Sequence, residues 1–435
     1  MSARNRELFA LLPATLLLIA GFAAIFIQRS AELSNVSLTY GAAFLGLCLV
    51  AHIVIRVTLP HADPYLFPLV AVLACFGLVV IYRIDDKLAR QQAEWFVVGL
   101  ALFTATILLV RDLRVLERYR YTIALAGIVL LFLPRVPVIG QAVNGAYLSV
   151  KVGPIAFQPA EFGKIAIVVF LAAYLRDTRQ ILVEGTHRVL GVTLPPLRHF
   201  GPLLFVWGAA MLMLIFIRDL GSSLMYFGGF LAVLYVATNR LSFTVVGLLL
   251  FALGAWFMGT HVPHVEDRVD VWLNPFQHAQ TTGYQIAQSM FAQADGGLFG
   301  TGFGASLLQV GGTVLLPAPQ TDMIYAVIVN ELGLVGACGL ILVYLLFAQR
   351  GFKTAMVAGD SFSKLLAVGL SSVFALQVFV IVGGVTRVIP LTGVTLPFVS
   401  YGGSSIMANF ILLALLLLVS DRARRPAGAR TRGLR

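Results

Sequence analysis

The chain has 435 residues, of which 59% are hydrophobic and only 12% are charged. Water-soluble globular domains usually carry about a quarter charged residues, so this composition excludes a soluble domain and predicts a chain that lies mostly in a bilayer. The net charge of +11 would suit nucleic acid, but the basic residues gather between apolar runs, and we therefore predict no nucleic-acid partner.

Twelve membrane-spanning helices are predicted, so the expected fold class is an all-α polytopic membrane protein. The N-terminal stretch has a basic start and an apolar run like a signal peptide, but the run is long and no small-residue cleavage site follows, so it is interpreted as the first anchor. The predicted spans lie near 9–28, 38–55, 65–82, 95–110, 121–134, 162–175, 201–217, 220–237, 242–259, 323–348, 365–385 and 405–420.

Positive charge predicts the orientation. With the N-terminus inside, the cytoplasmic segments hold about twice as many Lys and Arg as the outer segments. The tail 422–435 is rich in Arg, whereas the long segment 259–321 carries only Arg268. We therefore expect both termini in the cytoplasm and the long segment outside, with the basic residues also attracting anionic membrane lipids.

The outer segment 259–321 is too apolar and glycine-rich for a disordered linker, and loops of that length are usually functional. Within it, "GYQIAQSMFAQA" predicts a short helix at the membrane interface. The glycines of "GGLFGTGFG" have no GK[ST] and follow no strand, so they predict a close backbone approach or a bent re-entrant turn and not a nucleotide site. His261 and His264 indicate a metal only weakly, because no firm third ligand accompanies them.

Four predicted helices begin at the outer face beside polar residues. These are Glu161 and Lys164 at the sixth span, Arg218 and Asp219 before the eighth, Asp322 at the tenth, and Ser404 and Ser405 at the twelfth. Helix N-termini offer unpaired N–H groups and partial positive charge, which suit an anion such as a diphosphate.

Each of these features also has a structural interpretation. The pairs Thr321–Asp322 and Ser404–Ser405 are residue types that cap helices. Glu161 and Lys164 share a helix face and could form a structural ion pair, and Arg218 with Asp219 could be a solvated turn.

Glu331 is separated from Asp322 by the geometry of the helix that contains it. Each helical residue turns the chain by about 100°, so nine residues place Glu331 on the helix face opposite Asp322 and about 13 Å further along the helix axis. The two acids are therefore not a carboxylate dyad, and the expected role of Glu331 is structural.

Five segments occur in the order seen in SEDS proteins, the group of RodA, FtsW and SpoVE. They are "VNGAYLSVKVGPIAFQPAEFGK", "RDLGSS", "WLNPF…GYQIAQSMFAQADGGLFGTGFG", "LPAPQTD…NELGLVG" and "PLTGVTLPFVSYGGSSI". The resemblance covers residues from about 65 to 420, and within the group the chain is more similar to RodA than to FtsW. The family core has ten spans, so the resemblance implies two added helices in 1–60, the core in 61–421 and a basic tail in 422–435.

The resemblance implies a peptidoglycan glycosyltransferase, an inverting enzyme that polymerises lipid II at the outer face of the bacterial cytoplasmic membrane. It also implies a class B penicillin-binding protein as partner and a role in elongation, division or sporulation. A polyprenyl diphosphate donor carries its own leaving group, so no nucleotide or organic cofactor is expected. Mg²⁺ or Mn²⁺ is a candidate cofactor, although the sequence does not name its ligands.

The resemblance also assigns roles to residues. Asp322 stands where the family has its proposed catalytic Asp, and we expect it to deprotonate the acceptor hydroxyl. Expected to bind substrate or diphosphate are Lys164, Arg218, Arg268, Gln158, Ser404 and Ser405. Expected in supporting positions are Glu161, Asp219, Thr321, Glu331, Tyr401, Gly402 and Gly403.

The sequence departs from the family pattern beside the proposed base. Ala318 and Gln320 stand where the family usually has Glu and His, and Asn330 replaces the first residue of a Glu-Glu pair. An Arg-Trp pair is replaced by Tyr147-Leu148. These changes leave open reduced activity, altered substrate handling or dependence on a partner.

Two rival functions remain open at this stage. A lipid II flippase should have polar residues through the bilayer, whereas here they cluster at the outer face. A non-catalytic scaffold that recruits the penicillin-binding protein is the second rival, and the departures beside Asp322 make it more credible.

Overall fold

The fold is described from a computed structural model. It covers residues 2–29, 35–137, 139–143, 146–152, 155–184, 187–189, 192–194, 201, 205, 208, 217, 219–306, 308–310 and 313–426. The chain divides into two compact units. Unit 1 is Met1–Leu109, Arg268–Arg350 and Gln377–Arg435, and unit 2 is Val110–Asp267 and Gly351–Leu376.

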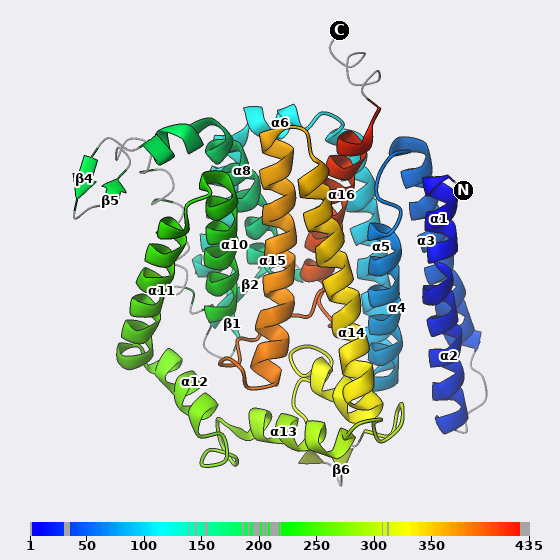
Figure 1. Cartoon of the computed structure of the whole chain (residues 1–435). Coiled ribbons are helices and arrows are strands. Elements are labelled where there is room, and N and C mark those ends of the chain that lie inside the picture. Colours follow the sequence, from blue (N-terminus) through cyan, green and yellow to red (C-terminus); the bar gives the residue numbers. More distant parts are fainter. Residues whose placement is uncertain are drawn as a thin grey trace. The chain divides into compact units, whose positions relative to one another are not determined.

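Unit 1 is a helical bundle in which α2, α4 and α5 run lengthwise in Figure 1, whereas α13 lies across one end. Its elements are α1 (Ala3–Ala10), α2 (Leu12–Arg29), α3 (Asn35–Thr58), α4 (Leu66–Ile84), α5 (Asp86–Leu109), α13 (Tyr284–Gly296), α16 (Gly403–Arg424) and the hairpin of β6 (Gln309–Val310) and β7 (Thr313–Val314). Helix α5 packs on α3, α4 and α16. A Cβ at Gly99 of α5 would lie 2.5 Å from the ring of Phe410, so glycine is required for this close approach.

Unit 2 contains the middle of the chain. Its elements are α6 (Arg114–Arg118), α7 (Arg120–Phe132), the 3₁₀ turn Leu133–Arg135, β1 (Gly140–Val143), β2 (Ala146–Val152), β3 (Ile155–Phe157), α8 (Pro159–Glu184), β4 (His187–Val189), β5 (Val192–Leu194), α10 (Leu220–Thr238) and α11 (Leu241–His261). Helix α8 packs on α7 and α10, and α10 packs on α11. The remaining helices α12 (Pro263–Leu273), α14 (Ile324–Val357) and α15 (Ser361–Val385) contribute residues to both units.

Short strands were not predicted from the sequence. β1, β2 and β3 form an antiparallel sheet in which Val150 of β2 is paired with both Gly140 and Phe157. β2 and β3 lie within the first of the five family segments, and β1 ends at its first residue. Apolar and polar residues alternate there over only a few positions. Such short alternation is a weak signal beside the long apolar runs, and the fold class remains helical.

Nine helical segments of the described residues are long and apolar enough to cross a membrane, and each matches one of the twelve predicted spans. The spans predicted near 121–134 and 162–175 correspond to α7 and α8. These two helices are not among the nine, because α7 has only 13 residues and α8 carries charged residues near both ends. Most of the span near 201–217 lies outside the described residues. The chain is therefore a multi-pass membrane protein.

Helix α5 begins nine residues before the predicted span near 95–110. The prediction was wrong here because Arg90, Gln91 and Glu94 interrupt the apolar pattern. These three side chains are exposed, whereas Gln92 is buried and donates a hydrogen bond to the Ser400 carbonyl at 3.1 Å. A polar residue that finds a partner inside the fold cannot be distinguished from an interfacial one by hydropathy alone.

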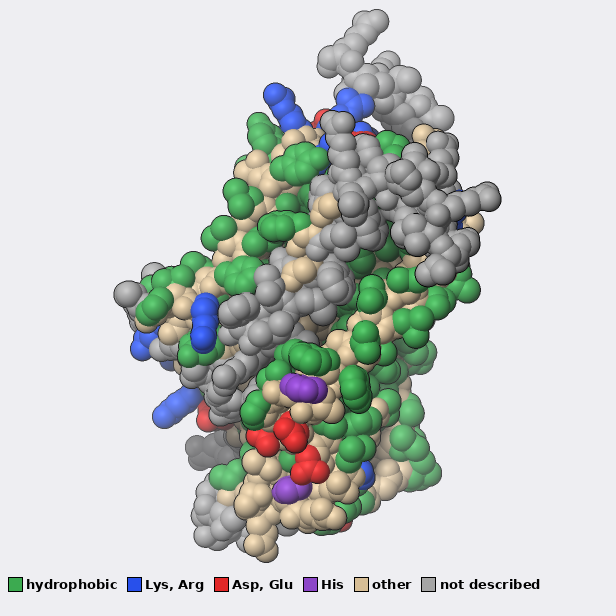
Figure 2. Space-filling view, turned by 90° about the vertical axis from the view of Figure 1, so that its left-hand side faces the viewer, with side chains coloured by type: hydrophobic (Ala, Val, Ile, Leu, Met, Phe, Trp, Pro, Cys, Tyr) green, Lys and Arg blue, Asp and Glu red, His purple; other side chains and the backbone are tan. Residues whose placement is uncertain are grey.

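The outer surface of α11 is apolar, as a lipid-facing helix requires. Leu249, Leu253 and Trp256 have 64%, 61% and 64% of their surface exposed. Figure 2 shows this side of the molecule, on which hydrophobic side chains predominate and acidic and histidine side chains gather near one end. Glu266 and Asp267, which follow α11 in the chain, are exposed.

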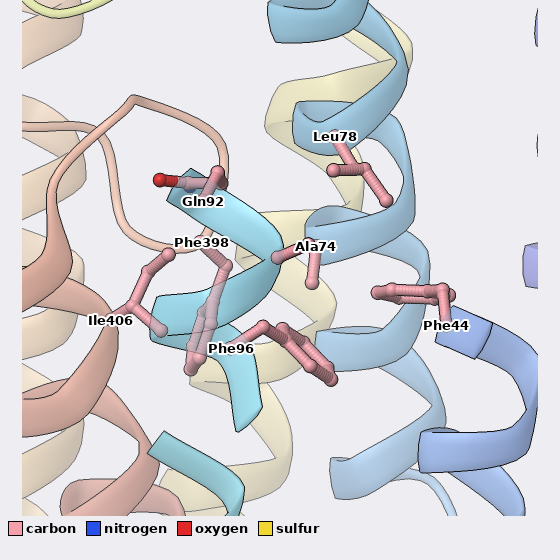
Figure 3. Close-up of a pocket in the computed structure, with 8 residues that line it drawn as sticks. Phe44, Ala74, Leu78, Gln92, Phe96, Phe398 and Ile406 are labelled. Atoms are coloured by element: carbon pink, nitrogen blue, oxygen red, sulfur yellow. The ribbon is translucent and has the colours of Figure 1, made fainter. Parts of the chain in front are cut away.

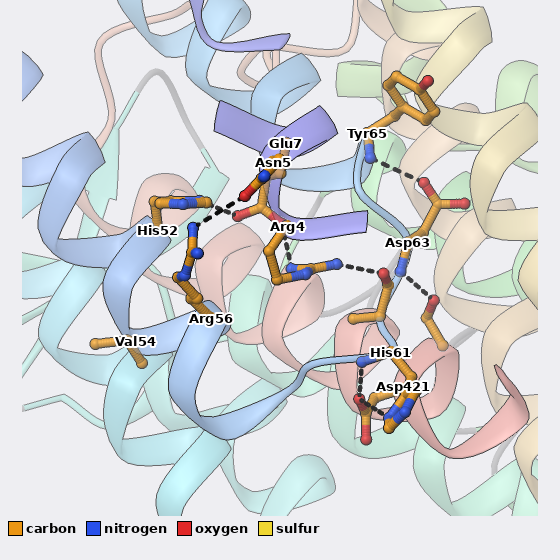
Figure 4. A network of polar contacts seen from close by, with 12 residues as sticks. Arg4, Asn5, Glu7, His52, Val54, Arg56, His61, Asp63, Tyr65 and Asp421 are labelled. Atoms are coloured by element: carbon orange, nitrogen blue, oxygen red, sulfur yellow. Dashed lines mark hydrogen bonds and ion pairs between the residues drawn. The ribbon is translucent and has the colours of Figure 1, made fainter. Parts of the chain in front are cut away.

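A buried polar network joins the first and last helices of unit 1 (Figure 4). Glu7 pairs with Arg4, and its other oxygen accepts a hydrogen bond from His52 Nδ1 at 2.8 Å. Arg4 also donates to the Ala62 carbonyl. The neighbouring Asp63 pairs with Arg424 of α16 at 2.7 Å. These contacts bring the start of α1 and the end of α16 to the same end of unit 1.

Candidate functional site

Asp322 lies in a tight turn immediately before α14. The amides of Thr321 and Met323 both donate to the Ala318 carbonyl, at 3.2 and 3.1 Å, and Ala318 has a positive φ of 49°. Within the part of the chain that the structure describes, the Asp322 carboxylate accepts no hydrogen bond, so the cap interpretation gains no support. Its side chain is partly buried and remains available to a substrate.

The electrostatic environment of Asp322 suits a base. Burial raises the pKa of this carboxyl to about 6, and the positive charge of Arg268 opposes the rise. Arg268 donates to the Leu391 carbonyl at 3.0 Å. Two residues further on, a Cβ at Gly393 would lie 3.7 Å from Asp322 Oδ2, so the 391–393 backbone forms one wall beside the carboxylate.

The segment "SYGGSS" is hydrogen-bonded directly to the residues before Asp322. Ser400 Oγ donates to the Thr321 carbonyl at 2.8 Å, and the Tyr401 amide donates to the Gln320 carbonyl at 2.8 Å. Two motifs about 80 residues apart in the sequence thus meet in one place. The structure brings together Thr321, Asp322, Arg268 and Tyr401 in unit 1.

The start of α16 lies beside this turn. Its N-cap is Gly402, whose side chain cannot cap the helix, and Ser404 and Ser405 lie within the first turn, so the cap interpretation of the two serines is wrong. The Gly402 amide donates to Gln92 Oε1 at 3.3 Å. The ring of Trp95 covers Gly403, where a Cβ would lie 2.5 Å from it.

Gln92 and Trp95 were not predicted from the sequence to lie at the candidate site. Both lie on the polar early turns of α5, and only the fold places them against the start of α16. The amide of Gln92 both donates to Ser400 and accepts from Gly402, so this side chain fixes the path of the "SYGG" turn. A glutamine between charged residues carried no signal of such a role.

The second group of predicted site residues lies in unit 2. Lys164 Nζ and Glu161 Oε2 form a buried ion pair at 2.5 Å. Asp219 caps α10 by accepting from the Ser222 amide at 2.9 Å. Gln158 is half-buried before α8, and Arg218 lies outside the described residues. For Glu161 and Lys164 this is the structural ion pair that the sequence had left open. Asp219 is a buried helix cap, so the solvated turn considered for it is wrong.

Glu331 has a partner that the sequence did not identify. Arg83 of α4 pairs with it through Nε at 2.8 Å, and the Gly304 amide donates to its other oxygen at 2.9 Å. The same arginine donates to the carbonyls of Gly304 and Ser306 at 2.7 and 2.6 Å. Glu331 therefore ties the loop 296–306 to α4 and α14.

The glycine-rich loop runs directly against the backbone of α14, as its glycines predicted. At Gly296 and Gly300 a Cβ would lie 2.2 and 2.1 Å from carbonyl oxygens of α14. Gly333, with φ of 65°, interrupts the helix, and the Leu334 and Val335 amides donate instead to the carbonyls of Gly297 and Leu298. The loop thereby satisfies backbone groups that the break in the helix leaves unpaired.

The described residues do not fit a dedicated divalent cation site. No group of three or more His, Cys, Asp and Glu side chains gathers among them. Glu161 is held by Lys164, and Asp219 is used as a helix cap. Mg²⁺ is commonly held by only one or two carboxylates together with substrate phosphates, so a cation would have to come with a phosphorylated ligand.

Comparisons with known proteins agree with the motifs. A family model described as "Cell cycle protein", for FtsW, RodA and SpoVE, matches residues 64–425. The peptidoglycan glycosyltransferase RodA of Mycobacterium tuberculosis strain H37Rv is 43% identical, over 99% of this chain and 93% of that protein. Stage V sporulation protein E of Bacillus subtilis is 30% identical, over 83% of this chain and 98% of that protein.

Solved structures give the same result. A chain from a peptidoglycan synthase complex is similar with a TM-score of 0.65 at 27% identity, covering 84% of this chain and 99% of that one. The rod shape determining protein RodA of Thermus thermophilus is similar with a TM-score of 0.59 at 26% identity, covering 84% and 98%. Together with the family match over most of the length, these likenesses establish that the chain belongs to the FtsW/RodA/SpoVE, or SEDS, family.

Proposed function

We propose that this chain is a peptidoglycan glycosyltransferase that polymerises lipid II at the outer face of the cytoplasmic membrane. The observation that carries the proposal is the placement of Asp322, a partly buried acid with a raised pKa, beside the start of α16. The name of its mycobacterial relative, a peptidoglycan glycosyltransferase, supports the same reaction class.

In the proposed reaction Asp322 takes the proton of the acceptor 4-hydroxyl. That oxygen forms a bond to C1 of the lipid-linked N-acetylmuramic acid, and the bond from C1 to the diphosphate oxygen breaks with inversion. The lipid diphosphate leaves with the bonding electrons. Help from a general base is typically worth about 10² to 10⁴ in rate.

The negative charge that develops on the leaving diphosphate must be stabilised by hydrogen-bond donors and positive charge. In unit 1 the proposed donors are Arg268 and the first amides of α16, together with Ser404 and Ser405. Lys164 and Arg218 remain diphosphate-binding candidates only through the resemblance of their segments to the family, and the proposed reaction does not depend on them. Mg²⁺ or Mn²⁺ bound to the diphosphate would supply additional positive charge.

The proposed orientation places both termini in the cytoplasm. The network around Arg4 and Asp63 supports a common end for the two termini, and the excess of Lys and Arg in the inner segments supports the cytoplasmic assignment. A class B penicillin-binding protein is the proposed partner, consistent with the similarity to a chain of a peptidoglycan synthase complex.

The proposal is tested by supplying fluorescent lipid II and Mg²⁺ to the purified chain, with and without its class B penicillin-binding protein. The expected product is a ladder of glycan chains on a gel. A parallel preparation of Asp322→Asn controls for contaminating polymerases. Lipid II binding without polymer under every partner condition would instead identify a scaffold, and translocation of lipid II in vesicles without polymer would identify a flippase.

The pH dependence of the reaction follows from the raised pKa of Asp322. Only the carboxylate accepts a proton, so kcat/KM is expected to rise with pH and to level off above about 6. Initial rates measured from about pH 5 to 8 check this. The exposed Glu266→Gln variant should retain the same profile, and a flat profile in the unmodified chain would contradict the assignment.

A further inference from the structure

Helix α12 lies along the connection 386–402 between α15 and α16. Trp272 Nε1 donates to the Arg387 carbonyl at 3.0 Å, and Arg268 Nη1 donates to the Leu391 carbonyl at 3.0 Å. Arg268 and Trp272 are four residues apart, so they lie on one face of α12. That face therefore runs beside the first residues of the connection, in the opposite chain direction. The four residues all belong to unit 1.

Arg387 returns two hydrogen bonds to the end of α12. Its guanidinium donates through Nε to the Trp272 carbonyl at 2.7 Å and through Nη2 to the Leu273 carbonyl at 2.6 Å. Leu273 is the last residue of α12, and the last carbonyls of a helix have no partner within it and carry partial negative charge. A guanidinium, with its fixed set of donors, suits two such carbonyls. Arg387 and Trp272 thus bond each other in both directions and join α12 to the connection.

The backbone at Arg387 is of the kind that favours glycine. Its φ is 61°, in the left-handed region. The Arg387 amide donates to the Gly384 carbonyl at 3.3 Å and the Val388 amide to the Gly383 carbonyl at 2.7 Å, which closes the end of α15. Glycine is the usual residue at this position after a helix, because a side chain there is strained. The bonds to α12 are therefore what an arginine adds here.

Phe398, later in the same connection, shows a different way to hold a left-handed residue. Its φ is 63°, and the residue is 1% exposed. The ring lies beside Phe96 and Ile406 in the interior of unit 1 (Figure 3), and 5.3 Å from the ring of Phe410. Packing in the core thus holds Phe398, whereas Arg387 is only partly buried and is held by its guanidinium. Removing the guanidinium therefore removes the contact that fixes this part of the connection.

The same part of the connection forms the wall beside Asp322. A Cβ at Gly393, two residues after Leu391, would lie 3.7 Å from Asp322 Oδ2. Arg268, whose positive charge acts on the Asp322 carboxylate, donates to Leu391. A shift of α12 along the connection would move both the cation and the wall relative to the acid. Misplacing a reacting group by about 1 Å can cost about 10² in rate.

We propose that Arg387 is a positioning residue for the Asp322 site, because it fixes α12 and the wall 391–393 against each other. It acts through Arg268 and the backbone of the connection, and it touches neither the substrate nor the acid. The inference rests on the proposed function, in which Asp322 is the base. A diphosphate-linked substrate then meets a cation and a wall that are already in place.

Three substitutions separate positioning from a structural role. Arg387→Gly removes the guanidinium but relieves the strained backbone, so the melting temperature should not fall. Its kcat for lipid II polymerisation should fall about tenfold and its KM should change less than about twofold, because the reacting groups are misplaced while the substrate still binds. Trp272→Phe removes one of the three hydrogen bonds and should lower kcat less. Arg387→Lys keeps the charge and a donor, and should recover part of the kcat.

Val388→Ala is the matched control, because Val388 is the next residue of the connection and is 59% exposed. It should keep the kcat of the unmodified chain. A normal kcat in Arg387→Gly would overturn the proposal, since Arg387 would then serve only to end α15.

Hydrogen exchange tests the contact without any substrate. Backbone amides of 268–273 should exchange faster in Arg387→Gly than in the unmodified chain, and those of α4 should not change. The range 268–273 is decisive, because the flexibility that glycine itself adds is confined to the connection. Unchanged exchange there would show that Arg387 does not fix α12, and would overturn the proposal. Absence of polymer from the unmodified chain with its partner would instead refute the proposed function, and the exchange result would still decide the contact.

Discussion

Polymerisation by Asp322→Asn is expected to fall by a factor of about 10² to 10⁴, the usual worth of a general base. The amide has nearly the same shape, but it cannot take the proton of the acceptor hydroxyl. The fold should be unaffected, because the carboxylate makes no hydrogen bond to the described residues that the substitution would break. Single-turnover rates with fluorescent lipid II measure the loss, since they exclude product release.

Two controls sharpen this expectation. Asp322→Glu keeps an acid and should retain part of the activity, because a longer side chain misplaces the base without removing it. Glu266→Gln removes an exposed acid elsewhere in the segment 259–321 and should behave like the unmodified protein. If Asp322→Asn polymerises at the normal rate while melting normally, another group must be the base.

The second large effect is expected at the ion pair of Arg83 and Glu331. Arg83→Met should destabilise the protein by about 3 to 5 kcal/mol, because it leaves a buried carboxylate without its partner. The Glu331 side chain is 1% exposed and that of Arg83 is 10% exposed. The substitution also removes the donors to the Gly304 and Ser306 carbonyls, so the loop 296–306 should loosen.

A double-substitution cycle tests this interpretation. Arg83→Met combined with Glu331→Gln should be less destabilised than Arg83→Met alone, since no buried charge then remains. The exposed pair Arg90–Glu94 is the matched control, and Arg90→Met should cost at most about 1 kcal/mol. Melting temperatures and protease susceptibility of the 296–306 loop provide the two measurements. Identical melting of the single and double variants would contradict the assigned pair.

The sequence determined those features that depend on long or ordered patterns. Nine of the predicted spans correspond to apolar helices, because about 20 consecutive apolar residues are a strong signal in a bilayer. The order of the five segments identified the family. The glycines of 296–304 predicted a close backbone approach, and the structure shows that the surface they approach is α14.

Only the tertiary structure decided which polar residues meet. The sequence assigned no role to Gln92 or Arg83, yet Gln92 fixes the turn before α16 and Arg83 pairs with Glu331. The caps likewise went to Asp219 and Gly402, and not to the serines. Hydropathy records how much each residue prefers water, but a hydrogen bond depends on where two distant segments come to lie. That placement is fixed by the packing of α4, α5 and α16, which no local pattern encodes.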